Sequence, residues 1–107
     1  MKDLMGLMKQ AQELQKRMQE AQAQLDEAEA VGESGAGLVT VTLSGKGDMK
    51  RIDLDPTILV ASEKEVVEDL IKAAHGEARR KAEELQQRVM KEAAGGLPLP
   101  PGFSFPG

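Results

Sequence analysis

The feature that most constrains the fold is a heptad repeat at the start of the chain. Apolar residues recur every seven positions in two series offset by three: Leu4, Ala11, Met18 and Leu25, and Leu7, Leu14, Ala21 and Ala28. This a/d spacing is typical of a helix that packs along a narrow seam. A helix over about residues 3–27 would be about 40 Å long. A compact domain of this size has a diameter of roughly 30–35 Å. We therefore expect part of the helix to project or to pack on a partner helix.

Three glycines, Gly32, Gly35 and Gly37, interrupt this pattern. A phosphate-binding loop of the Gly-x-x-x-x-Gly-Lys-Ser/Thr type leads into a helix, whose N–H groups hold the anion. Here the glycines lead into a strand pattern, and no lysine follows Gly37. The stretch therefore predicts a tight turn rather than a nucleotide site.

Residues 28–54 alternate as in a β-sheet. Val39, Val41 and Leu43 share one face of a run whose other face carries hydroxyl groups, as in a sheet with one face open to water. Asp55-Pro56 ends the pattern, since proline cannot continue the hydrogen-bond ladder. The sequence predicts three antiparallel strands, at about residues 28–34, 38–45 and 48–54.

A second long helix is predicted at about residues 62–94. Ser62 and Glu65 have the spacing of a capping box, in which side chain and backbone groups satisfy each other. Small residues between 73 and 82 would let another backbone approach closely. The segment 97–107, rich in proline and glycine, is predicted to be an extended tail after a single domain at 1–96.

Composition restricts the classes of function. The chain has 107 residues, no cysteine and only two aromatic residues, Phe103 and Phe105. So few large apolar residues favour oligomerisation. No apolar run long enough for a membrane span or signal core is present, so we expect a cytoplasmic protein without a membrane partner. The lone His75 and the pair Asp53 and Asp55 lack the neighbours that catalysis or a metal site would need. We expect no enzyme activity, no cofactor and no metal.

The net charge of −4 argues against wrapping of nucleic acid by a strongly basic surface, yet the cations are unevenly placed. Residues 1–18 carry four cations and two carboxylates, whereas residues 19–30 carry four carboxylates and no cation. Lys2, Lys9 and Lys16 are spaced by seven and share a stripe opposite the a/d seam. Many helix cations have a carboxylate four positions before them, as expected of a solvated face. Arg79 and Arg80 do not, and they can pair only in the weaker reverse orientation with Glu83 and Glu84.

Together these residues resemble the YbaB/EbfC family of bacterial nucleoid-associated proteins. The resemblance covers nearly the whole chain and is carried by Leu7–Gln12, Gly32–Val39, Ile52–Pro56, Glu68–Leu70 with Ala73-Ala74, and Leu99–Phe103. It implies an α+β fold of a long helix, a three-stranded antiparallel sheet and a second long helix. It further implies a tweezer-like homodimer that binds double-stranded DNA and organises or regulates the nucleoid.

Two functions remain open on the sequence. In the first, a homodimer with weak sequence preference binds DNA through six cations on projecting helices: Lys9, Lys16, Arg17, Arg79, Arg80 and Arg88. Its dimer interface would include five small or apolar residues: Leu38, Val39, Val41, Ala74 and Ala78. In the second, the chain is an adaptor for DNA repair or replication proteins, and the acidic residues Glu20, Asp26, Glu27 and Glu29 form its binding surface.

Overall fold

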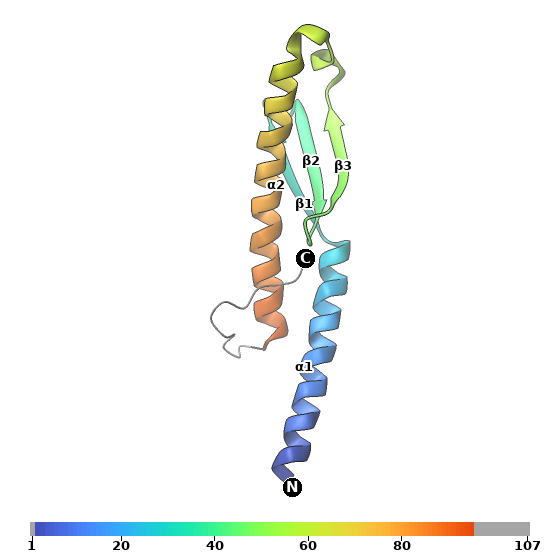
Figure 1. Cartoon of the computed structure of the whole chain (residues 1–107), viewed down its shortest axis with the longest axis vertical. Coiled ribbons are helices and arrows are strands. Elements are labelled where there is room, and N and C mark those ends of the chain that lie inside the picture. The colour runs from blue at the N-terminus through green and yellow to red at the C-terminus, as the bar shows by residue number, and fades with distance from the viewer. Residues whose placement is uncertain (1, 96–107) are drawn as a thin grey trace.

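The computed structural model describes residues 2–95 and shows two long helices joined by a sheet (Figure 1). The elements, in chain order, are α1 (Lys2–Glu27), β1 (Glu29–Ser34), β2 (Val39–Ser44), β3 (Met49–Leu54), the 3-10 turns η1 (Pro56–Ile58) and η2 (Ala61–Glu63), and α2 (Lys64–Ala93). The predicted α+β order of helix, three antiparallel strands and helix is confirmed. The predicted tail at 97–107 lies outside the described residues.

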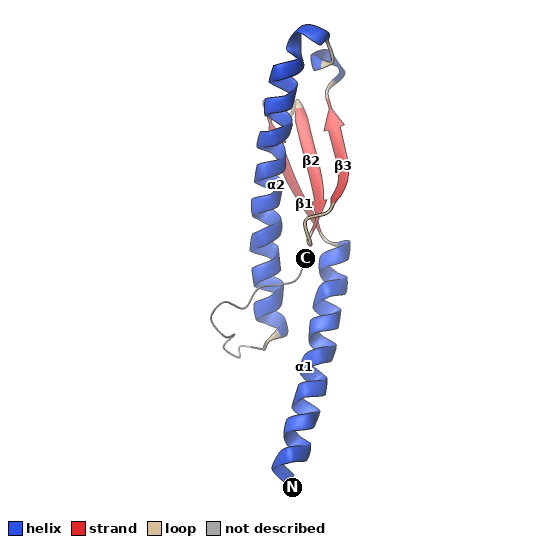
Figure 2. Ribbon diagram, viewed as in Figure 1, coloured by secondary structure: helices blue, strands red, loops and turns tan. Residues whose placement is uncertain are grey.

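The sheet has the order β1-β2-β3, and both strand pairs are antiparallel (Figure 2). Between β1 and β2 the backbone takes positive φ at Gly35, Ala36 and Gly37. Glycine adopts this conformation without steric cost, which explains two of the three positions. The predicted tight turn is confirmed, and β2 begins one residue later than expected because Leu38 still belongs to the turn.

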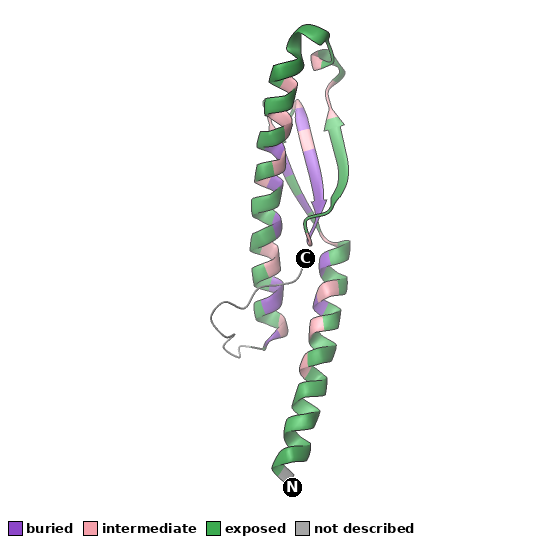
Figure 3. Cartoon of the chain, in the orientation of Figure 1, coloured by how far each residue is buried: buried purple, intermediate pink, exposed green. Residues whose placement is uncertain are grey.

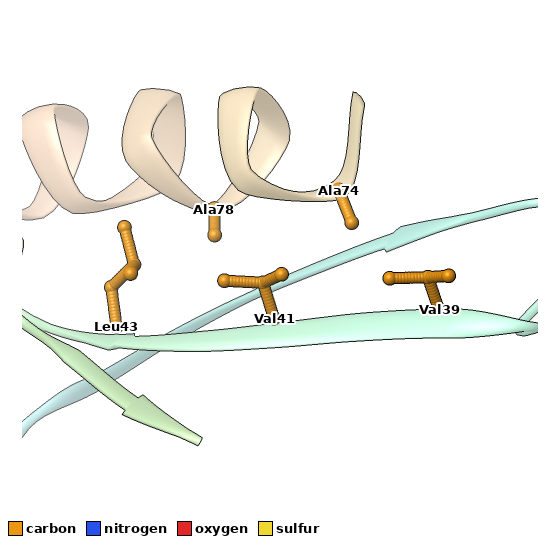
Figure 4. Close-up of a cluster of buried hydrophobic side chains, with 5 residues drawn as sticks. All are labelled: Val39, Val41, Leu43, Ala74 and Ala78. Carbon is orange, nitrogen blue, oxygen red and sulfur yellow. The ribbon is translucent and has the colours of Figure 1, made fainter. Parts of the chain in front are cut away.

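The core of the sheet lies where α2 crosses β2. Val39, Val41 and Leu43 point from β2 toward Ala74 and Ala78, and all five side chains are buried (Figure 4). This is the apolar face that the alternation predicts.

The other face of β2 is less open than the sequence indicates. Thr42 retains only 4% of its accessible surface. Arg51 on β3 forms an ion pair with Glu29 on β1, with 3.0 Å between Nη2 and Oε2, and β2 lies between these two strands. The ion pair therefore spans the central strand and accounts for part of this burial.

Only the C-terminal half of the heptad seam of α1 is packed against the rest of the chain. Ala21 and Leu25 are buried against Val89, with Leu85 and Ala93 beside them. Because α2 ends at Ala93, the N-terminal part of α1 extends past it, and Leu4 and Leu7 are 60% and 62% exposed (Figure 3). The molecule measures 72 × 24 × 17 Å, with a radius of gyration of 19.2 Å. A compact domain of this length would have about 13 Å. The expected projection is confirmed.

The start of α2 differs from the sequence-based expectation. Ser62 lies inside η2, the α-helix begins at Lys64, and its N-cap Glu63 makes no side-chain capping bond. The predicted capping box is therefore wrong. The capping side chain of this connection is Asp55, which accepts hydrogen bonds from the Thr57 N–H at 2.9 Å and the Thr57 hydroxyl at 2.6 Å. These bonds lower the pKa of the Asp55 carboxyl.

Candidate nucleic-acid interface

The projecting part of α1, residues 3–17, is here named the arm. Lys9 and Lys16 are both exposed on it and lie seven residues apart, on the side opposite the seam. Within residues 3–95, no carboxylate lies within 4.0 Å of the cationic groups of Lys9, Lys16 or Arg17. The arm therefore presents cations whose charge no neighbouring side chain neutralises. The side chain of Lys2, the first member of this stripe, lies outside the described side chains.

Arg17 lies where the arm meets the end of α2. A groove of about 220 Å³ opens there, and its lining residues are Arg17, Glu20, Ala21, Gln24, Val89, Glu92 and Ala93. The Arg17 guanidinium lies beside the backbone of Gly95, only 2.7 Å from the position that a Cβ atom would take. Arg17 is thus held at the junction of the two helices, apart from the Lys9 and Lys16 stripe.

Arg79 and Arg80 form the reverse-orientation ion pairs that the sequence allows. Arg79 Nε lies 3.2 Å from Glu83 Oε1, and Arg80 Nη1 lies 2.8 Å from Glu84 Oε1. Both arginine side chains remain at least 60% exposed. An exposed pair of this kind contributes only about 0.2–1 kcal/mol to stability, so a phosphate can compete for the guanidinium.

The i, i+4 spacing suggests four favourably oriented pairs, of which one forms: Glu13–Arg17, Glu68–Lys72, Glu77–Lys81 and Glu84–Arg88. Glu77 pairs with Lys81 at 3.2 Å, and the same Lys81 ammonium donates to the Val31 carbonyl on β1. Glu77 also accepts from the Glu33 N–H. The bond from Lys81, the bond from Glu33 and the Lys81 charge lower the pKa of Glu77, in that order of size. This pair fastens α2 to β1 rather than facing solvent freely.

The three arginines of α2 do not share one face. At about 100° per residue, Arg79 and Arg88 are separated by about 180° around the helix axis. Arg88 lies seven residues after Lys81 and hence on the β1 side, whereas Arg79 lies on the opposite side. A duplex that lies along one side of α2 therefore cannot contact both Arg79 and Arg88 of one chain.

Two further cations belong with these groups, and the sequence reasoning did not select them. Lys72 is exposed seven residues before Arg79 and thus shares its side of α2. Lys91 is exposed three residues after Arg88, on the same side as Arg88. Neither has a carboxylate within 4.0 Å in the described part of the chain. The sequence could have indicated Lys72 and Lys91 as members of these groups through their helical spacing from Arg79 and Arg88.

The acidic surface of the alternative hypothesis is partly neutralised. Asp26 pairs with Lys46 at 3.1 Å, and Glu29 pairs with Arg51. Of the four carboxylates proposed as a binding surface, Glu20 and Glu27 form no ion pair within residues 3–95. No group of three or more metal-binding side chains occurs among the described residues, and none of the described helices is long and apolar enough to cross a membrane.

Four of the five residues predicted for a dimer interface lie in the core of the single chain. Val39, Val41, Ala74 and Ala78 are each 0% exposed within one chain, where they pack on one another. They form the chain's own core and leave no side-chain surface for a second copy. Their small size and apolar character fit either role, which is why the sequence could not separate them. Leu38 is half-buried at the end of the turn.

Comparison with known proteins identifies the family. The profile of the YbaB/EbfC DNA-binding family matches residues 1–97. The chain belongs to the YbaB/EbfC DNA-binding family. Similar members are nucleoid-associated proteins of Maricaulis maris (61% identity) and Granulibacter bethesdensis (50% identity), each aligned over 99% of both chains. The crystal structure of an uncharacterized protein from Helicobacter pylori has the same fold, with a TM-score of 0.69 at 20% identity over 83% of this chain and 90% of that one.

Proposed function

We propose that this YbaB/EbfC protein is a nucleoid-associated homodimer that binds double-stranded DNA through phosphate contacts and has weak sequence preference. The observation that carries the proposal is the arm, whose cations Lys9 and Lys16 project beyond the body of the molecule without a neutralising carboxylate. DNA at the cytoplasmic nucleoid is the partner that this charge pattern and the family favour.

The cations extend over a length that suits a duplex. The rise of α2 from Arg80 to Gly95 is about 22 Å, and that of α1 from Arg17 to Lys9 is about 12 Å. Their sum is close to one turn of B-form DNA, about 34 Å. Arg80 and Arg88 lie within this length, Arg88 on the side of α2 that faces β1 and Arg80 on its outer side. Arg79 and Lys72 form a separate group on the side of α2 opposite Arg88. Several phosphates can thus be contacted at once.

The chemistry of these side chains favours contact with phosphates rather than reading of bases. The described residues contain no phenylalanine, tyrosine or tryptophan, so bases lack the usual stacking platform among them. Lysine and arginine contacts to phosphates fix position but carry no sequence information. They release counterions, so affinity falls steeply with salt.

The homodimer is proposed to form at the edge of the sheet where β3 lies, which α2 leaves uncovered. Helix α2 lies across β1 and β2, whereas five of the six β3 residues are exposed (Figure 3). Met49 and Ile52 on β3 are 52% and 41% exposed, and three apolar residues near the start of α2 are also exposed: Leu59, Val60 and Val66.

The accessible surface supports this proposal. The chain exposes 7770 Å², whereas a compact monomer of 11.5 kDa exposes about 5,800 Å². A typical stable interface covers about 800 Å² on each partner. An elongated chain with this accessible surface has room for such a contact outside its own core. The second hypothesis, an adaptor for repair or replication proteins, gains no support from a surface on which Asp26 and Glu29 are paired within the chain.

DNA binding is tested by titrating a duplex at salt concentrations from 50 to about 200 mM, the range over which phosphate contacts weaken strongly. Lys9→Gln with Lys16→Gln is expected to weaken binding to all duplex sequences alike and to reduce the slope of log affinity against log salt by about 2 per protomer. Lys9→Arg with Lys16→Arg, which keeps both positive charges of the arm, is the control and should bind like the native protein. Equal effects of both pairs, or binding that ignores salt, would contradict the assignment to the arm.

The dimer is tested by sedimentation velocity. Ile52→Asp places a charge on the exposed side of β3 and is expected to shift a dimer toward monomer at micromolar concentration. Asp48→Ala, in the neighbouring turn, should leave the dimer intact. A native protein that sediments as a monomer at these concentrations would refute the proposed dimer.

A further inference from the structure

The a/d seam of the arm has no partner within residues 2–95. Leu4 and Leu7 are exposed, Leu14 and Met18 are half-buried, and the same seam is buried only at Ala21 and Leu25. Soluble proteins seldom leave a continuous row of large apolar side chains in water unless something covers it. The question is which segment does so.

The end of α2 brings the chain to the seam. Gly95 has a φ of +63°, the left-handed conformation that ends a helix and turns the backbone away from its axis. It lies beside Arg17, at the point where the seam becomes exposed. The apolar residues that line the groove between α1 and α2 are Ala21, Val89 and Ala93. The chain therefore leaves the described structure beside an apolar path along the arm.

The remaining chain has the composition and length to cover this path. Residues 97–107 have no charged side chain and include two leucines, four prolines and both phenylalanines of the protein. Extended proline-rich chain advances about 3.1 Å per residue, so Phe103 can reach about 25 Å from Gly95. The arm from Arg17 to Leu4 is about 20 Å long. Proline-rich chain also loses little conformational entropy when it docks.

We propose that the tail of this chain, residues 97–107, folds back and docks along the a/d seam of its own arm. Leu97 and Leu99 occupy the groove beside Val89 and Ala93, and Phe103 and Phe105 pack on Leu7 and Leu4. The tether gives the tail an effective concentration in the millimolar range, well above that of a second copy in a micromolar solution. Docking on its own arm therefore outcompetes contact with a separate molecule, and the position of Gly95 beside Arg17 starts the tail next to the arm of its own chain.

The docked tail gives the arm two different faces. The seam is covered by a segment with no charged side chain, while Lys9 and Lys16 on the opposite side remain open to solvent. This inference concerns the covering of the seam and holds whether or not the arm binds DNA.

The two phenylalanines make the proposal directly measurable, because they are the only ones in the chain. Full-length protein labelled with 4-fluorophenylalanine should give two ¹⁹F resonances displaced from those of a free peptide of residues 97–107. Leu7→Asp, at an exposed position away from the core, should move both resonances toward the peptide values. Met5→Gln, on the other side of the arm and 73% exposed, should leave them in place. Resonances that match the peptide and ignore Leu7→Asp would overturn the proposal.

Disulfide trapping separates docking within one chain from docking between chains. The protein has no cysteine, so the double variant Met8→Cys with Ser104→Cys can form only one kind of bond within a chain. We expect it to oxidise at least tenfold faster than Met5→Cys with Ser104→Cys, and to yield linked monomers. If a mixture of ¹⁴N and ¹⁵N protein yields mainly dimers that link one ¹⁴N chain to one ¹⁵N chain, the tail covers the arm of another copy. If the two double variants oxidise at equal rates, the tail covers neither its own seam nor that of another copy.

Discussion

The backbone of Gly32 on β1 touches the backbone of Ala78 on α2. A Cβ atom at Gly32 would lie 3.1 Å from the Ala78 Cα, and closer still to the Ala78 nitrogen and the Ala74 carbonyl oxygen. Helix and strand can approach this closely only because one has no side chain and the other has a methyl group. The glycine-rich stretch at residues 32–37 thus contributes to packing as well as to the turn.

Gly32→Ala is expected to destabilise the fold, since the new methyl group meets rigid backbone. Overpacking of this kind typically costs about 1–3 kcal/mol, and we expect the upper part of that range. Urea unfolding should show a lower midpoint at an unchanged slope. A variant as stable as the native protein would mean that α2 and β1 are less closely packed than the structure shows.

Gly76→Ala is expected to have the opposite effect. A Cβ atom at Gly76 would meet no other atom of the chain within 4 Å. Alanine in place of a solvent-facing helix glycine stabilises by up to about 1 kcal/mol. The same urea measurement should give a higher midpoint than the native protein. Loss of stability would reveal a contact at Gly76 that the single chain does not contain.

The contrast between these two glycines shows what the sequence could predict. Periodicity predicted both helices, the three strands and the buried face of β2, because burial on one side leaves a regular pattern. It could not tell which small residues face the strand, since Ala74 and Ala78 fit an inner core and a subunit interface equally well. Local spacing also misassigned the cap at Ser62, because the 3-10 turn η2 delays the start of the α-helix. For the candidate nucleic-acid interface, spacing identified the cations of α2. The contact of Lys81 with β1 was needed to show which of them lie on the side that faces the sheet.

Glu77→Gln is expected to weaken the attachment of α2 to β1 in a pH-dependent way. The folded-state pKa of Glu77 is lowered by the Lys81 and Glu33 bonds, so the ionised carboxylate stabilises the fold at pH values above its unfolded-state pKa of about 4.3. This contribution is lost as the pH falls through the lower, folded-state pKa. Urea unfolding should therefore separate the native protein from the variant at pH 7 and bring them together near pH 3, an acidity that protonates most carboxyls. Glu65→Gln, which removes an unpaired carboxylate from the first turn of the same helix, is the control. A difference that persists at low pH would show that the carboxylate's ionisation is not its source.

Glu83→Gln with Glu84→Gln is expected to strengthen DNA binding. Both carboxylates occupy arginines proposed to contact phosphates, with Arg79 at 3.2 Å and Arg80 at 2.8 Å. Their removal frees the guanidinium groups and raises the local positive charge, while the lost pairs cost stability only about 0.2–1 kcal/mol each. At low salt we expect duplex affinity to rise several-fold, with a steeper dependence on salt because more counterions are released. Glu65→Gln with Glu68→Gln makes the same charge change nearer the start of α2 and serves as the control. If both double variants bind equally, the gain comes from net charge alone, and Arg79 and Arg80 do not contact the duplex.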